Sequence, residues 1–346
     1  MKNLINQLYE GQHLDDAALL QLITMPDNSE DEQYLFSKAD SRKREIYQDK
    51  IFIRGLIELS NYCKNNCLYC GIRAANKNIS RYRLTKEQVS DCAKHGYELG
   101  FRTFVLQGGE DTAYSDKDIC DMVSGIKELF PDCAVTLSIG EKSYESYKAY
   151  REAGADRYLL RHETATKEHY KQLHPEAMSF ENRLRCLQDL KALGYQVGSG
   201  FMVGSPYQTP LHLIADLRFL QELQPDMIGI GPFIPHHQTP FAKEKQGDLH
   251  LTLRMLAILR LMFPKTLLPS TTALGSIDPD GRIMGLQCGA NVVMPNLSPL
   301  DVRELYKIYD NKAYINAEAA EGLSLLKAQA SSIGCQIVID RGDAKK

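Results

Sequence analysis

The feature that most constrains this chain is an alternation of short apolar, β-branched runs with helix-like segments, starting at Ile51. In the intervening segments, such as TKEQVSDCAKHGYELG, apolar residues recur every three to four positions. Strand–helix repeats of this kind are typical of an α/β protein with a parallel sheet. Eight repeats predict a closed TIM-type (β/α)8 barrel. The apolar runs span 51–59, 103–108, 134–140, 156–161, 196–204, 227–233, 266–271 and 291–296.

The regions outside this repeat predict two flanking additions to the barrel. Residues 1–48 hold three polar-amphipathic stretches with helical periodicity, which predict an N-terminal helical cap. We expect the barrel to occupy residues 49–311 and a C-terminal helical extension to occupy 312–346.

Charge and hydropathy favour a small-molecule partner. The net charge is -3, from 41 basic and 44 acidic residues, and no long block of one sign would attract nucleic acid or an anionic membrane. The first residues lack the apolar core of a secretion signal, and no segment approaches the ~20 apolar residues of a membrane span. We therefore expect a cytoplasmic monomer that binds neither nucleic acid nor membrane.

Three of the nine cysteines lie close together directly after the first predicted strand, at Cys63, Cys67 and Cys70. This spacing lets one loop place three thiolates around one inorganic cluster and leaves an iron without a protein ligand, whereas electron-transfer clusters usually have four cysteines. A structural zinc loop with His95 or a distant fourth ligand, or three unrelated thiols, remain alternatives. The cysteines expected to be core thiols, because they lie among apolar neighbours in helical patterns, are Cys92, Cys120 and Cys186.

With Tyr69, the triplet resembles the C-x3-C-x-aromatic-C motif of the radical S-adenosylmethionine (SAM) superfamily. The resemblance implies that Cys63, Cys67 and Cys70 bind a [4Fe-4S] cluster whose open iron is chelated by SAM. It also implies that an electron from the cluster breaks the sulfur–C5′ bond of SAM and yields a 5′-deoxyadenosyl radical.

Polar residues at the ends of the strands are expected to bind the cofactor, because active sites in this fold lie at the carboxyl-terminal rim. Gly108, Gly109 and Glu110 resemble the GGE motif that receives the SAM amino group, although an ordinary tight turn accounts for the glycines equally well. Glu163 is the candidate acceptor for the ribose hydroxyls.

Tyr69, Arg183 and Met202 complete the expected SAM site. Arg183 is the candidate partner of the SAM carboxylate, with a surface salt bridge as the alternative. Residues 200–204 resemble the superfamily's adenine-side motif, in which Met202 is expected to pack near the reactive carbon. Tyr207 stands where that motif often has an acidic residue, which leaves the adenine contacts open.

Almost the whole chain is similar to the HydE family of [FeFe]-hydrogenase maturases. The resemblance implies a role in assembling the two-iron part of the hydrogenase active site, on an iron–carbonyl–cyanide cysteine complex. It also implies partner maturases and a reducing electron donor. The strings that carry the similarity include RGLIELSNYCKNNCLYCGIR, FVLQGGED, GADRYLLRHETA, SFENRL, GIGPFIPH, TTALG and CGANVVMPN.

An anionic substrate of this kind needs cationic and hydroxyl-bearing groups at the barrel mouth. The candidate substrate-binding residues are Arg161, Thr271, Thr272, Tyr306 and Thr136, and Gln107 is a weaker candidate. For each of these residues, core packing or an ordinary hydrogen bond is an equally good explanation.

Three competing functions stay open. Biotin synthase carries a second cluster on cysteines inside its barrel, whereas the strand interiors here contain none; residues 312–334 also lack cysteine, so one cluster is expected. A methylornithine synthase, which rearranges a carbon skeleton, shares several stretches with this chain and is the first alternative. A non-catalytic iron–sulfur or zinc scaffold is the alternative from a different class.

Overall fold

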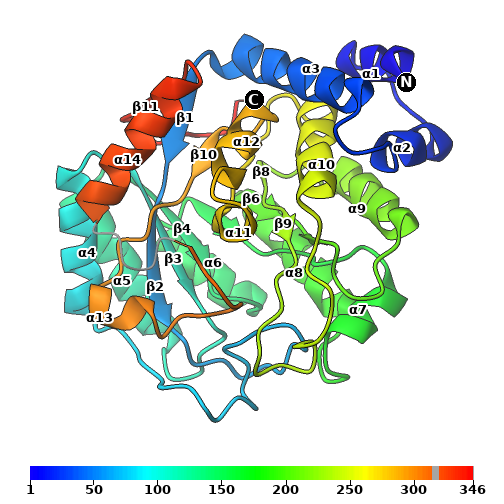
Figure 1. Cartoon of the computed structure of the whole chain (residues 1–346). Helices are drawn as coiled ribbons and strands as arrows, with labels where there is room; N and C mark the ends of the chain where they lie inside the picture. Colours follow the sequence, from blue (N-terminus) through cyan, green and yellow to red (C-terminus); the bar gives the residue numbers. More distant parts are fainter. Residues whose placement is uncertain (314–318, 346) are drawn as a thin grey trace.

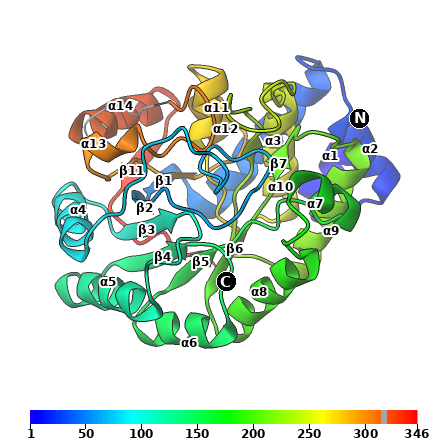
Figure 2. The ribbon, with the colours of Figure 1, turned by 90° about the horizontal axis from the view of Figure 1, so that it is seen from below.

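The barrel strands are built as parallel neighbours in chain order. The computed structural model describes residues 1–313 and 319–345. The first strand consists of β1 (Lys50–Ile53) and β2 (Gly55–Ser60). A six-stranded parallel sheet has the order β2-β3-β4-β5-β6-β8 (Figure 2). Its other members are β3 (Thr103–Gly108), β4 (Ala134–Ser138), β5 (Arg157–Leu159), β6 (Gln196–Ser199) and β8 (Met227–Ile228).

Backbone hydrogen bonds close this sheet into a ring. Residues 266–270 pair with β8 through Ile228 N–H, which donates to the Leu267 carbonyl at 2.9 Å. The same segment pairs with β10 (Val292–Val293), because Ser270 N–H donates to the Val292 carbonyl at 2.9 Å. Strand β10 in turn pairs in parallel with β1. The predicted (β/α)8 barrel is therefore confirmed.

Two of the predicted strands are interrupted near the mouth of the barrel. After β6, Gly200 adopts φ +154°, and a Cβ there would lie 1.9 Å from the Gly229 carbonyl oxygen. The chain then forms β7 (Met202–Val203), which pairs with β9 (Gly231–Pro232). The runs 196–204 and 227–233, expected to be continuous strands, are each split where the two backbones meet.

The outer layer consists of helices that begin at polar residues. Thr85, Ser115 and Ser179 each accept a backbone N–H at a helix start, which satisfies one of the otherwise unpaired donors there. Figure 1 shows these helices around the strands. They are α4 (Lys86–Glu98), α5 (Asp116–Leu129), α6 (Tyr144–Glu152), α7 (Lys167–Leu173), α8 (Phe180–Ala192), α9 (Pro210–Leu223), α10 (Leu249–Met262), α11 (Thr272–Ile277) and α12 (Gly281–Gln287).

The N-terminal region is helical, as predicted, with α1 (Lys2–Tyr9), α2 (Asp16–Ile23) and α3 (Glu30–Tyr47). These helices lie at the amino-terminal ends of the barrel strands (Figure 1). The buried Glu32 of α3 accepts hydrogen bonds from Arg254 at 2.7 Å and His250 at 3.0 Å, both on α10. This cap therefore leaves the opposite, carboxyl-terminal rim open for a site.

The C-terminal region differs from the expected all-helical extension. After α13 (Leu300–Arg303) and α14 (Ala319–Ser332), strand β11 (Gln336–Val338) pairs in parallel with β1. Residues 314–318 and 346 of the predicted extension lie outside the described residues. Within the described part of the chain, no helix combines the length and the apolar character needed to cross a bilayer.

Candidate active site

The cysteine loop follows β2 and crosses the carboxyl-terminal end of the barrel (Figure 2). Three distant segments hold its backbone. Lys64 N–H donates to the Glu110 carbonyl at 3.0 Å, and Leu68 N–H donates to the Leu173 carbonyl at 2.9 Å. Gly71 N–H donates to Ile308 at 2.9 Å. The loop that carries the three thiols is thus fixed from the β3 turn, from α7 and from the segment after α13.

The three thiols are half-buried on one loop. Burial raises the pKa of Cys63 and Cys67; burial, then Cys63 and the charge of Glu163, raise that of Cys70 to about 12. A structural zinc site is usually closed by four protein ligands, whereas this loop offers three thiols.

The other cysteine expectations agree with this arrangement. His95, the suggested fourth zinc ligand, is exposed on the outer helix α4. Cys92 and Cys186 are buried as expected, and Cys120 is half-buried on α5. None of these four side chains therefore joins the loop.

Tyr69 forms one side of an apolar wall beside the loop. Its ring stands at 87° to that of His174, with centroids 5.5 Å apart, and its hydroxyl lies 3.2 Å from His174 Nε2. Tyr69 also packs against a buried group that contains Met202 and Phe233. Two residues predicted to contact SAM, Tyr69 and Met202, therefore meet on this wall.

The turn after β3, residues 108–110, touches the cysteine loop directly. A Cβ at Gly109 would lie 2.1 Å from the Tyr62 carbonyl oxygen, so only glycine fits. Glu110 accepts from Glu141 N–H at 3.0 Å and pairs with Lys64 at 3.2 Å. The turn of Gly108, Gly109 and Glu110 thus lies against the cysteine loop.

Arg161 and Glu163 face each other at the end of β5. Arg161 Nη2 lies 3.2 Å from Glu163 Oε2, but outside hydrogen-bond geometry. Arg161 Nε, Arg161 Nη2 and Glu163 Oε2 are buried and have no hydrogen-bond partner within the described residues. Buried polar atoms without partners are costly, so these atoms are suited to meet a ligand.

Arg183, at the start of α8, is only 6% exposed, which excludes a surface salt bridge. Its Nε donates to Glu141 at 2.6 Å, and its Nη1 donates to the Arg161 carbonyl at 2.6 Å. The guanidinium therefore joins α8 to the ends of β4 and β5 beside Glu163.

The residues expected to bind substrate divide between two depths of the barrel. Thr271 precedes α11 and has a buried hydroxyl without a partner in the described chain, and Thr272 is the first residue of that helix. The buried Tyr306 hydroxyl accepts from Gln107 at 3.3 Å. Thr136 does not join Arg161 at the mouth.

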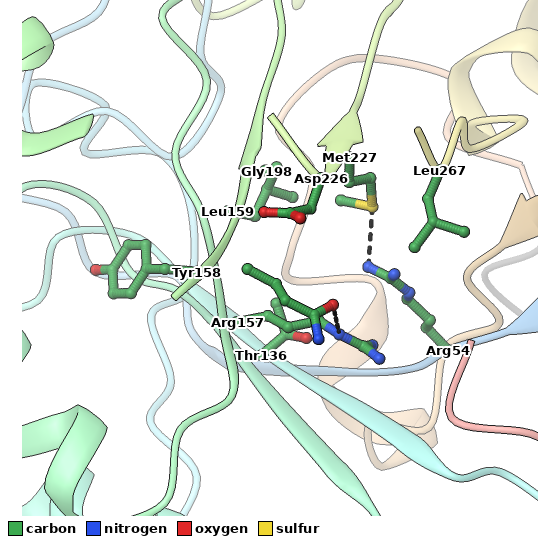
Figure 3. Close-up of a pocket in the computed structure, with 10 residues that line it drawn as sticks. Arg54, Thr136, Arg157, Tyr158, Leu159, Gly198, Asp226, Met227 and Leu267 are labelled. Carbon is green, nitrogen blue, oxygen red and sulfur yellow. Dashed lines mark hydrogen bonds between the residues drawn. The ribbon is translucent and has the colours of Figure 1, made fainter. Parts of the chain in front are cut away.

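Thr136 instead lines a small cavity inside the barrel, farther from the mouth (Figure 3). Arg54 and Arg157 also line it; Arg54 is fully buried, and its Nη1 lies 2.9 Å from Met227 Sδ. Arg157 begins β5, whereas Arg161 follows the end of that strand. No local pattern indicates this depth, because Thr136 is simply one position within the predicted strand AVTLSIG.

Sequence reasoning missed a buried charged pair under the mouth. Glu58 on β2 is 1% exposed and accepts from Lys312 Nζ at 2.5 Å and from Asn296 at 2.8 Å. Lys312 also donates to the Tyr306 carbonyl at 3.0 Å. Glu58 could have been identified from the sequence, because it is an acidic residue inside the apolar run 51–59.

The sequence has well-characterised relatives. The profile of the Radical SAM superfamily matches residues 57–220. The [FeFe] hydrogenase maturase subunit HydE of Thermotoga maritima is 51% identical over 278 residues, covering 80% of this chain and 79% of the relative. The 3-methylornithine synthase of Methanosarcina acetivorans is 30% identical over 302 residues, covering 85% of this chain and 84% of the relative.

Solved structures agree on the fold. The crystal structure of methylornithine synthase (PylB) superposes with a TM-score of 0.85 at 27% identity, covering 97% of each chain. That of the hydrogenase maturase HydG superposes with a TM-score of 0.80 at 21% identity, covering 96% of this chain and 74% of HydG. This chain therefore belongs to the radical SAM superfamily and, within it, to the family of the HydE maturases.

Proposed function

We propose that this radical SAM enzyme cleaves SAM reductively and acts in maturation of the [FeFe]-hydrogenase active site. The observation that carries the proposal is the loop with Cys63, Cys67 and Cys70. Its three thiols are held on one loop, and the turn at Gly109 lies directly against Cys63.

The residues present suit a [4Fe-4S] cluster held by three thiolates. Such a cluster, when bound, supplies the open iron that SAM chelates and the electron that breaks the sulfur–C5′ bond. The protein's own contribution is positional. The wall of Tyr69, Met202 and Phe233 excludes water beside the loop, which protects a reactive radical from side reactions.

The polar residues around the loop would hold the other parts of SAM. Among the described residues, Glu163 Oε2 is a buried acceptor without a hydrogen-bond donor, which suits the donating hydroxyls of ribose. Arg183 would pair with the carboxylate, and the turn at Gly109 and Glu110 would receive the amino group. The pairing of Arg183 with Glu141 leaves its Nη2 as the atom for this contact.

The substrate proposed for the mouth of the barrel is the anionic iron–carbonyl–cyanide cysteine complex. Within the described part of the chain, Arg161 Nε and Nη2 and the buried Thr271 hydroxyl have no hydrogen-bond partner and are available to an anionic ligand. Thr272 and Tyr306 would complete the contacts. The identity to a HydE maturase supports this substrate, a partner maturase that supplies it and a reducing electron donor.

A methylornithine synthase-like mutase is the second candidate, favoured by the likeness of the backbone to PylB and the 30% identity to two archaeal synthases. A biotin synthase-like sulfur insertion is disfavoured because the barrel interior offers Gln107, Thr136 and Ser199 rather than cysteine. The higher identity to HydE decides the order.

One set of assays separates these functions. The protein is reconstituted anaerobically with iron and sulfide and reduced in the presence of SAM, and 5′-deoxyadenosine is quantified. We expect this product, and activation of apo-hydrogenase when the other maturases are added. Formation of methylornithine from lysine without hydrogenase activation would favour the mutase; no SAM cleavage at all would leave only a scaffold.

A further inference from the structure

The turn that carries Arg161 and Glu163 is fastened by a fully buried chain of three polar side chains. His162 Nδ1 lies 2.9 Å from Ser199 Oγ at the end of β6, and His162 Nε2 lies 3.2 Å from Asp216 Oδ1 on α9. All three residues are 0% exposed. No role in the proposed chemistry accounts for them.

The direction of each hydrogen bond follows from the partners. An ionised carboxylate only accepts, so His162 Nε2–H donates to Asp216 Oδ1, and Nδ1 of the neutral imidazole accepts from the Ser199 hydroxyl. The Ser199 oxygen also accepts from the backbone N–H of His162 at 3.2 Å. Asp216 Oδ1 also accepts from Ala165 N–H at 2.6 Å. The network therefore holds the turn on both sides of Glu163.

This turn is strained at Glu163. Glu163 has φ +67°, a left-handed conformation that is unfavourable for a non-glycine residue. Its N–H donates to the Gly200 carbonyl at 3.1 Å. The His162 side chain reaches Asp216 on the outer helix α9, whereas Arg161 Nη2 and Glu163 Oε2 lie 3.2 Å from each other.

The surroundings of the network are apolar. The His162 ring lies between Phe201 and Phe219, with centroid distances of 5.8 and 4.7 Å. Asp216 Oδ2 has no hydrogen-bond partner in the described part of the chain. A buried carboxylate is costly, and well-packed apolar residues often give equal or greater stability. The arrangement is thus better suited to fixing a geometry than to adding stability.

We propose that His162 is a positioning residue, which sets Arg161 and Glu163 at their mutual distance through Ser199 and Asp216. The inference rests on the proposed binding roles of Arg161 and Glu163. The same hydrogen-bond network of His162, Ser199 on β6 and Asp216 on α9 then positions both the SAM site and the substrate site. Loss of this network therefore weakens SAM binding even where the fold is intact.

The test separates positioning from stability with a pair of variants. His162→Phe keeps the ring volume but leaves Asp216 as an unpaired buried charge, so it should lower both the free energy of unfolding and the affinity for SAM. Adding Asp216→Asn removes that charge and keeps the acceptor for Ala165 N–H. We expect the double variant to regain stability while its affinity for SAM stays about tenfold weaker than that of the parent protein.

The measurements are isothermal titration with SAM, electron paramagnetic resonance of the reduced cluster with SAM, and urea unfolding, all on the reconstituted protein. His250→Phe is the matched control, because it breaks a histidine–carboxylate bond to Glu32 on α3 that involves neither Arg161 nor Glu163, and it should leave SAM affinity unchanged. A double variant that regains parental SAM affinity and the parental spectrum overturns the proposal. Unchanged affinity in Glu163→Gln would instead reject the ribose role of Glu163, whatever the His162 variants do.

Discussion

Arg161 Nη2 and Glu163 Oε2 lie 3.2 Å apart, so the cation proposed for the substrate and the acceptor proposed for SAM are immediate neighbours. Each has buried atoms without a hydrogen-bond partner among the described residues. A ligand at one side chain therefore changes the electrostatic environment of the other. This proximity suits a reaction in which a SAM-derived radical must meet a second molecule.

Glu163→Gln is expected to weaken SAM binding. A carboxylate that accepts hydroxyl donors in a buried site contributes on the order of 1.5–3 kcal/mol, and the amide has one acceptor oxygen instead of two. Isothermal titration with SAM on the reconstituted variant measures this loss. Retained affinity would move the ribose contact to another residue.

Arg161→Lys is expected to spare SAM affinity and to reduce hydrogenase maturation. Lysine keeps the charge but lacks the planar fork that binds an anion with two hydrogen bonds. SAM cleavage without maturation should persist, as measured by 5′-deoxyadenosine beside a hydrogenase-activation assay. If Arg161→Lys lost SAM and Glu163→Gln retained it, the two roles would be exchanged.

The cysteine loop is expected to hold about four irons per chain after anaerobic reconstitution. Alanine at Cys63, Cys67 or Cys70 should abolish SAM cleavage, because each removes one of three ligands. Cys92→Ala and Cys120→Ala should leave cleavage intact, since these thiols lie on the outer helices α4 and α5. Iron analysis and product quantification test both points, and eight irons bound reproducibly would contradict a single cluster.

Gly109→Ala is expected to impair cluster binding more than its size suggests. The added Cβ would lie 2.1 Å from the Tyr62 carbonyl oxygen, so the backbone beside Cys63 must move. Iron content and SAM affinity should both fall.

Gly125→Ala is the matched control for this substitution. Gly125 lies within α5, and a Cβ there meets nothing within 4 Å. The substitution should raise the free energy of unfolding by up to ~1 kcal/mol through helix propensity and leave SAM affinity unchanged. Equal loss of affinity in both variants would show that the contact with Tyr62 is unimportant.

The barrel was predictable from sequence because each strand and helix carries its own periodicity. Apolar runs such as those around Phe104 and Val135 recur along the sequence with helical segments between them, and this repeat indicates eight parallel strand–helix units. Ring closure at Leu267 and Val292, and the break at Gly200, depend on contacts between distant backbones that no local pattern encodes. Strand β11 was not predictable for the same reason, because it is formed by pairing with β1, which lies far away in the sequence.

Part of the candidate site was visible in the sequence because it lies on one loop. Cys63, Cys67 and Cys70 fall within eight positions, and with Tyr69 their spacing resembles a family motif. Glu58 and Lys312 form a pair across 254 positions, which periodicity cannot predict. The depth of Thr136 likewise depends on the stagger between neighbouring strands.

Lowering the pH is expected to destabilise the fold partly through His169, which is fully buried on α7. Burial lowers the pKa of His169 below its usual 6.5, because the cation cannot be solvated there. Its ring nitrogens lie 3.1 Å from Thr164 Oγ1 and 2.9 Å from the Pro206 carbonyl oxygen. As the pH falls below about 6.5, the unfolded chain takes up a proton that the folded chain does not. The contribution to stability is therefore present above pH ~6.5 and declines at lower pH, by at most about 1.4 kcal/mol per pH unit.

Urea unfolding between pH 7 and 5, compared with His169→Gln, isolates the contribution of His169 to the pH dependence of stability. The variant should show a shallower decline, and identical slopes in the two proteins would contradict the assignment.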